Sequence, residues 1–265
     1  MNKIKLNGLT QEESDNILPS NTILLGCVGS IAHGTQIPNS NPDSIDDIDL
    51  MGIAIAHVNV YLGLGKFEQK EVFYKEWDSV IYEIRKFFSL LLKQNPNVMG
   101  LLWLREQDYI YKSEYGQEII DNRNLFISKN AYNSFVGYAR GQLHRMEHSA
   151  CKGYMGQKRK QLVEKFGYDC KNAAHLIRLL RMGIEFLGDG QLQVYRPDAD
   201  ELKEIKSGKW KLDDIKKYAD DLFFAASLAY EKSPLPEEPD YKKAEELLMD
   251  ILESVLIYDM VDELC

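Results

Sequence analysis

The sequence predicts an α+β fold, in which a small mixed sheet in the first half of the chain is followed by a helical half. Two observations support this division. Short apolar runs bounded by turn residues are found before residue 86, and longer runs with helical periodicity are found after it. The Pro-rich stretch SPLPEEPD, residues 233–240, indicates a linker before the last helix. We therefore expect two domains, spanning residues 1–125 and 126–265.

The expected strands are short segments rich in apolar and β-branched residues, and they lie at residues 22–28, 48–56, 71–74 and 79–85. The expected helices repeat apolar residues at intervals of three and four positions. They lie at residues 86–93, 96–104, 115–122, 130–155, 158–166, 169–187, 199–207, 212–231 and 241–262.

The stretch LLGCVGSIAHGTQIPNSNPDSIDDIDLMGIAI, residues 24–55, has the strongest functional pattern. Gly29 and Ser30 follow an apolar run, where glycine permits a tight turn and the adjacent N–H groups and hydroxyl can hold a phosphate. Asp47 and Asp49 are two positions apart in a second apolar run, so in a strand they point to the same side, about 7 Å apart at their Cα atoms. Paired carboxylates can bind Mg²⁺, and the combination therefore predicts phosphoryl-transfer chemistry.

Gly29-Ser30 followed by Asp47-Ile48-Asp49-Leu50 resembles the signature of the nucleotidyltransferase superfamily typified by DNA polymerase beta. The strings GSIAHGT and MGI are similar to a branch of bacterial and phage nucleotidyltransferases that includes a proposed RNA-repair group. The resemblance continues through YLGLGKFEQ, YEIRKFFSLLLKQNPNV and YDCKNAAHLIRLLRMGIEFL. It implies a catalytic domain at residues 1–125 that uses Mg²⁺ or Mn²⁺ and a nucleoside triphosphate.

Two of these assignments leave alternatives. The insert NSNPDSID before the aspartates is longer than the link usual in the superfamily, so either Asp46 or Asp47 could be the first metal ligand; alternation with Asp49 favours Asp47. His33, in the Gly-Ser loop, either contacts a phosphate or caps the turn.

Superfamily members usually have a third carboxylate on a neighbouring strand. In SVIYEIR, alternation places Glu83 on the same face as Ile81 and Arg85. Glu83 is our candidate for the third metal ligand or for the general base, and Asp78 is its rival. The alternative is a solvent-facing glutamate on an edge strand.

The helix expected at residues 169–187 has an apolar face and, opposite it, a polar strip that contains Lys171, His175 and Arg178. The strip has no acidic residue. Lys171 and Arg178 are therefore candidates for contacts with triphosphate or RNA phosphate, with His175 as a donor beside them. A plain solvated helix face is the alternative. If the helical half folds over the catalytic half, the three residues face Asp47 and Asp49 across a cleft.

The protein has a formal net charge of −9, but residues 135–181 contain ten Lys or Arg and three Asp or Glu. This local excess of +7 suits an RNA or tRNA acceptor. Residues 126–265 are thus expected to form a helical domain with a basic substrate-facing surface. Its last helix has an acidic face and an apolar stripe that predicts packing rather than mimicry of nucleic acid.

Other features exclude several classes of protein. No apolar run is long enough to span a membrane and the first residues lack a signal-peptide core, so we expect a soluble, cytoplasmic protein. The four cysteines have no CxxC spacing, which predicts free thiols. His144, His148 and Cys151 have helical spacing but no fourth ligand, and we do not expect a metal site there.

The leading hypothesis is a nucleotidyltransferase that transfers a nucleoside monophosphate from a nucleoside triphosphate to a hydroxyl group, with an RNA 3′ end as a candidate acceptor. The alternative is an inactive relative that binds nucleotides or RNA and acts as a regulator. The intact pair Asp47 and Asp49 favours the enzyme.

Overall fold

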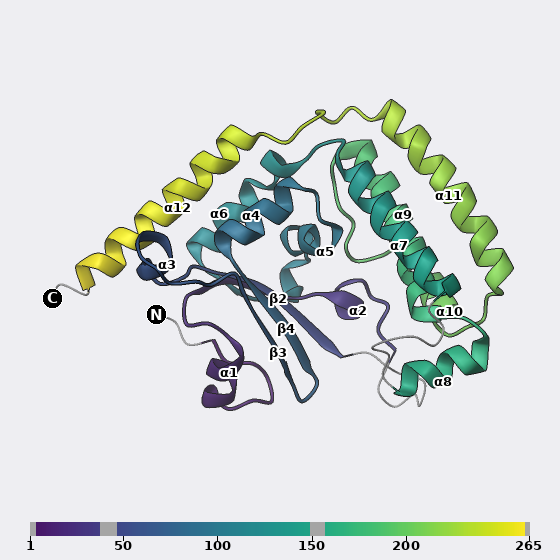
Figure 1. Cartoon of the computed structure of the whole chain (residues 1–265), viewed down its shortest axis with the longest axis horizontal. Helices are drawn as coiled ribbons and strands as arrows, with labels where there is room; N and C mark the ends of the chain where they lie inside the picture. Colours follow the sequence, from purple (N-terminus) through teal and green to yellow (C-terminus); the bar gives the residue numbers. More distant parts are fainter. Residues whose placement is uncertain (1–3, 38–46, 149–156, 263–265) are drawn as a thin grey trace.

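The computed structural model describes residues 4–37, 47–148 and 157–262. Its strands are β1 (Thr22–Cys27), β2 (Ile48–Ala54), β3 (Gln69–Tyr74), β4 (Trp77–Glu83) and β5 (Tyr109–Lys112). Its helices are α1 (Gln11–Ile17), α2 (Gly29–Ala32), α3 (Val58–Leu62), α4 (Ile84–Leu92), α5 (Pro96–Met99), α6 (Glu114–Asp121), α7 (Ala131–His148), α8 (Gln157–Phe166), α9 (Cys170–Asp189), α10 (Ala199–Lys206), α11 (Leu212–Lys232) and α12 (Tyr241–Asp262). The predicted α+β class is confirmed (Figure 1).

The strands form one sheet in the order β3-β4-β2-β1-β5. Strands β2 and β4 run parallel, whereas the other neighbours are antiparallel. In the parallel pair, Asp49 lies opposite Asp78 near one end and Ala54 lies opposite Glu83 at the other. The sheet is therefore mixed, as expected, and its register decides which acidic residues can meet.

The two faces of the sheet are covered by different parts of the chain. One face packs against α1 and the segment before it, through buried residues such as Leu25, Leu50 and Ile81. The opposite face carries Met51 and Ile53 and joins the main apolar core. Alternation along β2 therefore directs Asp49 to the side of the main core.

Helices α7 and α9 pack side by side in the second half, with α10 and α11 around α9 (Figure 1). The predicted apolar face of α9 is buried, including Leu176, Ile177 and Leu180. At Gly183 an added Cβ would stand 2.9 Å from Cβ of Phe135, so glycine permits the close approach of α7. The close packing holds the polar strip of α9 in a fixed place beside the sheet.

The terminal helix α12 lies over the first half of the chain, next to α4 and α3, and not over the other long helices (Figure 1). On α12 itself, Ala244, Leu247 and Ile251 are buried, while Glu245 and Glu246 are exposed. It is thus a packed helix with an acidic outer face, as the sequence predicts. The division near residue 125 stays a prediction, because the main core contains residues from both halves.

None of the helices in the described part of the chain is both long and apolar enough to cross a lipid bilayer.

Candidate active site

The turn after β1 is built around Gly29, whose φ of +62° is strained for other residues. The side chain of Asp49 lies against this glycine: an added Cβ would stand 1.8 Å from Oδ2 of Asp49. In addition, the backbone N–H of Val28 donates to the carbonyl oxygen of Asp49 at 2.9 Å. Glycine at this position therefore lets the turn and the strand approach closely enough to set the place of the carboxylate.

Ser30 follows in α2 and lines the same pocket as Asp49. Its Oγ is buried and has no hydrogen-bond partner among the described residues. Leaving a buried hydroxyl unpaired has a cost that a ligand could remove. Gly29 and Ser30, which the sequence predicts as a phosphate-binding turn, thus lie beside Asp49, the second of the two predicted aspartates.

Three aspartates lie near the same end of the parallel pair. Asp49 is half-buried and Asp78 stands opposite it on β4, and both line the pocket, whereas Asp47, which is exposed immediately before β2, does not line it. Burial, followed by the negative charges of Asp47 and Glu71, raises the pKa of Asp78, whereas Lys171 lowers it. The carboxylates therefore form one region of concentrated negative charge. Asp46, the alternative to Asp47, lies outside the described residues.

Glu83 has a different place and different partners. It lies opposite Ala54 at the far end of β4 and is buried, and it does not line the pocket. Its Oε2 accepts from the N–H of Lys86 at 3.2 Å and caps α4, while its Oε1 accepts from the hydroxyl of Tyr61 at 2.8 Å. Glu83 is five positions, or about 16 Å along the strand, from Asp78. The structure thus brings Asp78 to Asp49 and leaves Glu83 in a helix cap.

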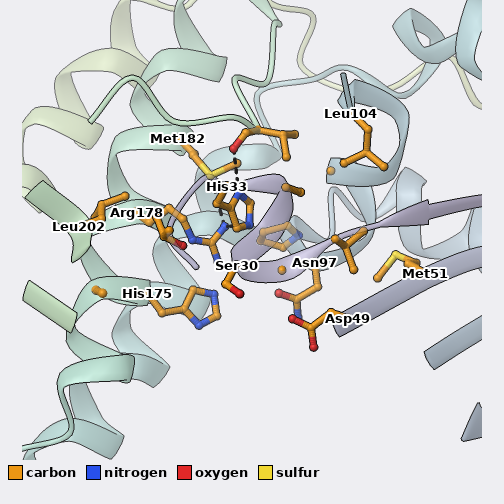
Figure 2. A pocket seen from close by; sticks show the side chains of 18 of the residues that line it. Ser30, His33, Asp49, Met51, Asn97, Leu104, His175, Arg178, Met182 and Leu202 are labelled. Carbon is orange, nitrogen blue, oxygen red and sulfur yellow. Dashed lines mark hydrogen bonds between the residues drawn. The ribbon is translucent and has the colours of Figure 1, made fainter. Parts of the chain in front are cut away.

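A pocket of about 390 Å³ lies between the sheet and α9. In Figure 2, Ser30 lies between His175 of α9 and Asp49 of β2, and Arg178 reaches in from the same helix. Its apolar lining includes Met51, Leu104, Met182 and Leu202 (Figure 2). The pocket therefore has an acidic side from the sheet, a basic side from α9, and an apolar lining.

Lys171, His175 and Arg178 all line this pocket, which puts the polar strip of α9 where the sequence expected it. Within the described part of the chain, Lys171 has no hydrogen-bond or ion-pair partner. The Nε2 atom of His175 is buried and also lacks one there. Burial, followed by the positive charges of Arg178 and other cations, holds the pKa of His175 well below its usual range. His175 is therefore a neutral side chain near neutral pH.

His33 also lines the pocket, but both of its ring nitrogens have protein partners. Nδ1 lies 2.8 Å from the carbonyl oxygen of Val194, and Nε2 contacts Nη1 of Arg178. Burial and the charge of Arg178 hold the pKa of His33 well below its usual range. Of the two roles expected for His33, the structure shows the cap: His33 ends α2, and its main-chain N–H donates to the carbonyl oxygen of Gly29 at 3.1 Å. Both ring nitrogens have protein partners.

Arg178 lies deep in the pocket. Burial, with a smaller contribution from Arg196, lowers its pKa to about 9. Its Nη1 contacts His33 and lies 3.5 Å from Sδ of Met182. The guanidinium group stays charged at neutral pH, because even the lowered pKa is well above 7.

Other cations of the basic segment are engaged in the structure. Arg159 pairs with Asp169, whose side chain caps α9, and donates to Asn172. Arg181 pairs with Asp198 and Glu201. The sequence excess of positive charge therefore overstates how much of the segment is available to a ligand.

Two lining residues were not expected from the sequence. Asn97 lies beside Pro96 at the start of α5, and Lys206 is a buried lysine on α10 whose Nζ donates to the carbonyl oxygen of Thr35 at 3.3 Å. Neither belongs to a periodic polar strip or a motif. The packing of α5 against α4 and α7, and of α10 against α9, brings them to the site.

Among the described residues, no three His, Cys, Asp or Glu side chains converge closely enough to hold a metal ion by themselves. Of His144, His148 and Cys151, at which no metal site is expected, Cys151 lies outside the described residues. A cation in the pocket would thus have to share protein carboxylates with ligand oxygens, which is the coordination that Mg²⁺ favours.

Comparisons with known proteins point to one family. The family model described as RlaP, RNA repair pathway DNA polymerase beta family, matches residues 1–250. No curated protein matches the chain. One solved structure, a nucleotidyltransferase-like protein from Exiguobacterium sibiricum, is 10% identical, with a TM-score of 0.31 and coverage of 91% of this chain and 77% of its own. With a TM-score that low, the family match alone carries the assignment.

Proposed function

This chain belongs to the RNA repair pathway DNA polymerase beta family, and on that premise we propose that it transfers a nucleoside monophosphate from a nucleoside triphosphate to a hydroxyl group. Membership indicates a nucleotidyltransferase of the DNA polymerase beta type. The observation that best supports the specific reaction is the pocket itself. Asp49 and Asp78 line one side, while Lys171 and Arg178 line the other.

The acidic side suits a divalent cation. Asp49 and Asp78 stand opposite each other on neighbouring strands, and Asp47 precedes β2 closely enough for its charge to raise the pKa of Asp78. Hard carboxylate oxygens are the ligands that Mg²⁺ and Mn²⁺ prefer, and Mg²⁺ commonly uses one or two carboxylates together with water and substrate phosphates. We assign Asp47 and Asp49 as the protein ligands. A bound cation would supply positive charge near the phosphate oxygens as the reaction proceeds.

Asp78 is the better candidate for the third carboxylate. It lines the pocket beside Asp49, whereas Glu83 is committed to the cap of α4 and to Tyr61. A general base must come within hydrogen-bonding reach of the proton that it removes. Asp78 meets that requirement for a hydroxyl group bound in the pocket, either directly or through one water molecule.

The basic side suits the triphosphate. Lys171 and Arg178 are cations without carboxylate partners in the described part of the chain, and His175 and Ser30 present unpaired buried atoms to the same pocket. Charge-assisted hydrogen bonds from such groups bind phosphate strongly. The apolar lining from Met51, Leu104 and Met182 would contact the nucleoside.

The chemistry is an exchange at the α-phosphorus. The acceptor oxygen forms a bond to phosphorus as the bond from phosphorus to the bridging oxygen of the β-phosphate breaks. Pyrophosphate leaves with that electron pair, and the proton of the hydroxyl passes to Asp78 and then to solvent. Positioning and charge stabilisation account for most catalysis of this kind.

An RNA 3′ end is the acceptor that the family description favours. Arg145 and Lys160 are exposed on α7 and α8, and the charge of Arg145 acts on His175 in the pocket. These cations could guide an RNA backbone toward the site.

The experiment uses the four nucleoside triphosphates, each labelled at the α-phosphate, with Mg²⁺ or Mn²⁺ and cellular RNA. We expect label to enter RNA with wild-type protein, and not with the Asp49→Asn variant or with a γ-phosphate label. Label in protein or in a small molecule would replace RNA as the acceptor. No transfer of label from any triphosphate to any acceptor would overturn the proposed activity.

A further inference from the structure

The hydrogen bonds of His33 fix its protonation state. A carbonyl oxygen can only accept, so Nδ1 must donate its proton to the oxygen of Val194, 2.8 Å away. A guanidinium group can only donate, so Nε2 must accept from Nη1 of Arg178. Both bonds can be made only by neutral imidazole with its proton on Nδ1. The lowered pKa of His33 agrees with this state.

The backbone around His33 holds the ring in place. The N–H of Arg196 donates to the carbonyl oxygen of His33 at 3.2 Å, and Arg196 lies two residues after Val194, whose carbonyl oxygen accepts the hydrogen bond from the ring. His33 is therefore tied through its main chain and its side chain to one short segment beyond α9. The acceptor atom Nε2 is left pointing at Arg178 (Figure 2).

The partner of Arg178 differs from those of the other arginines packed around α9. Arg159 pairs with Asp169, and Arg181 pairs with Asp198 and Glu201. Arg196 pairs with Glu185 and Asp198. Each of these cations has its charge balanced by a carboxylate, whereas Arg178, which lines the pocket, has a neutral histidine instead, with no carboxylate partner among the described residues.

We propose that His33 is a positioning residue that orients the Arg178 guanidinium toward an anionic phosphate group without cancelling its charge. A carboxylate at this position would also hold the guanidinium, but it would offset the charge that a phosphate needs. A side chain without an acceptor would leave the charge free and the orientation loose. The inference rests on the proposed function for the identity of the phosphate, which would belong to the nucleoside triphosphate.

The test compares three substitutions at one position. The amide of glutamine reaches the place of Nε2, so His33→Gln keeps a neutral acceptor for Arg178. The shorter His33→Asn can keep the bond to Val194 but does not reach Arg178. His33→Glu keeps an acceptor and makes it negative. Calorimetry would measure binding of inorganic triphosphate in the presence of Mg²⁺, and thermal unfolding would be measured for every variant.

We expect His33→Gln to bind triphosphate within about three-fold of wild type, and His33→Asn and His33→Glu to bind about ten-fold or more weakly, which is the scale of one charge-assisted hydrogen bond. A role confined to holding the Val194 segment predicts the reverse order for Gln and Asn. That reverse order, or equal binding by all three variants, would overturn the proposal.

A double-mutant cycle separates action through Arg178 from direct contact with the ligand. In an Arg178→Ala background, His33→Asn should cause no further loss of triphosphate binding. An undiminished loss there would show that His33 acts independently of Arg178 and would overturn the positioning role. If a variant does not fold, nitrogen-15 NMR of the wild-type protein at neutral pH provides a second test. His33 must then carry its single ring proton on Nδ1, and a proton on Nε2 would overturn the proposal.

These readouts do not depend on catalysis. If no nucleotidyl transfer is found but the order of the His33 variants holds, the proposed function fails and the role of His33 in anion binding stands. If transfer is found and is lost in Asp49→Asn, but the His33 variants bind alike, the proposed function stands and the positioning role fails.

Discussion

The Asp49 carboxylate occupies the space in which a Cβ on Gly29 would stand. The predicted clash with Oδ2 is 1.8 Å, and the same two segments are joined by the hydrogen bond from Val28 to the main chain of Asp49. The Gly29-Ser30 turn and the Asp49 carboxylate are therefore one structural unit, although 19 residues lie between Gly29 and Asp49 in the sequence.

Gly29→Ala should displace the Asp49 side chain and lower kcat/KM about 100-fold, because a shift of about 1 Å at a positioned group can have that effect. The control is Gly8→Ala, since Gly8 also has a positive φ but no atom within 4 Å of an added Cβ. Both variants should lose stability because of the positive φ, and Gly29→Ala should lose more because Asp49 must also move. If the two also lose similar activity, the contact with Asp49 has no role in the reaction.

Asp49→Asn and Asp47→Asn should each reduce nucleotidyl transfer on the order of 10³-fold or more, because a metal ligand is lost and metal binding supplies several kcal/mol of transition-state stabilisation. The fold should be retained, since neither residue belongs to the apolar core. Initial rates across a Mg²⁺ titration and thermal unfolding are the measurements. A variant with wild-type turnover would remove that residue from the metal site.

Asp78→Asn and Glu83→Gln form a matched pair. We expect Asp78→Asn to lose most activity with little change in melting temperature, because its side chain is exposed in the pocket. Glu83→Gln should lose about 1 kcal/mol of stability, because the charged cap of α4 is weakened, and keep its activity per folded molecule. The opposite outcome would return the third carboxylate to Glu83.

The difference between these two residues shows where sequence reasoning stops. Alternation predicts that Asp47 and Asp49 share a face, because it depends only on the local period of a strand, but β2 begins at Ile48 and Asp47 lies just before it. The choice between Asp78 and Glu83 depends on the register of β4 against β2 and on the point at which β4 ends. β4 was expected to run through Arg85, but Glu83 caps α4 and the helix begins at Ile84.

Helical periodicity was informative for α9, because the apolar face and polar strip expected at residues 169–187 lie within the observed helix of 20 residues. Shorter elements were missed: α1, α3 and β5 are each seven residues or fewer. The capping box of α1 at Thr10 and Glu13 was a readable signal. The partner of the His33 ring, 161 positions away at Val194, was not readable, because it depends on packing of distant segments.

Lys171→Ala should weaken binding of inorganic triphosphate with Mg²⁺ about ten-fold, because one charge-assisted contact is lost from the basic side of the pocket. Melting temperature should change little, since Lys171 has no ion-pair partner among the described residues. Lys217→Ala removes an exposed lysine of α11 that does not line the pocket and should bind like wild type. Parallel losses of stability and binding in Lys171→Ala would indicate a structural role.

The salt dependence of RNA binding tests the acceptor class. When cations of the protein neutralise RNA phosphates, counterions are released. Each such contact with a single strand contributes about −0.7 to the slope of the logarithm of the binding constant against the logarithm of salt concentration. Arg145 and Lys160 are the cations to replace, because both are exposed and outside ion pairs in the described part of the chain. Arg159 is unsuitable, since its pairing with Asp169 helps to hold the start of α9.

Replacing Arg145 and Lys160 together with glutamine should reduce the magnitude of the slope by about 1.4 if each contacts one phosphate. The control variant replaces Lys66 and Lys217 with glutamine, which removes the same charge from exposed positions outside the pocket. Fluorescence titrations of a short RNA between about 50 and 200 mM salt measure both slopes. Equal slopes in the two variants would mean that binding responds to net charge alone. In that case the surface of α7 and α8 is not an RNA path, and the search for the acceptor should turn to proteins and small molecules.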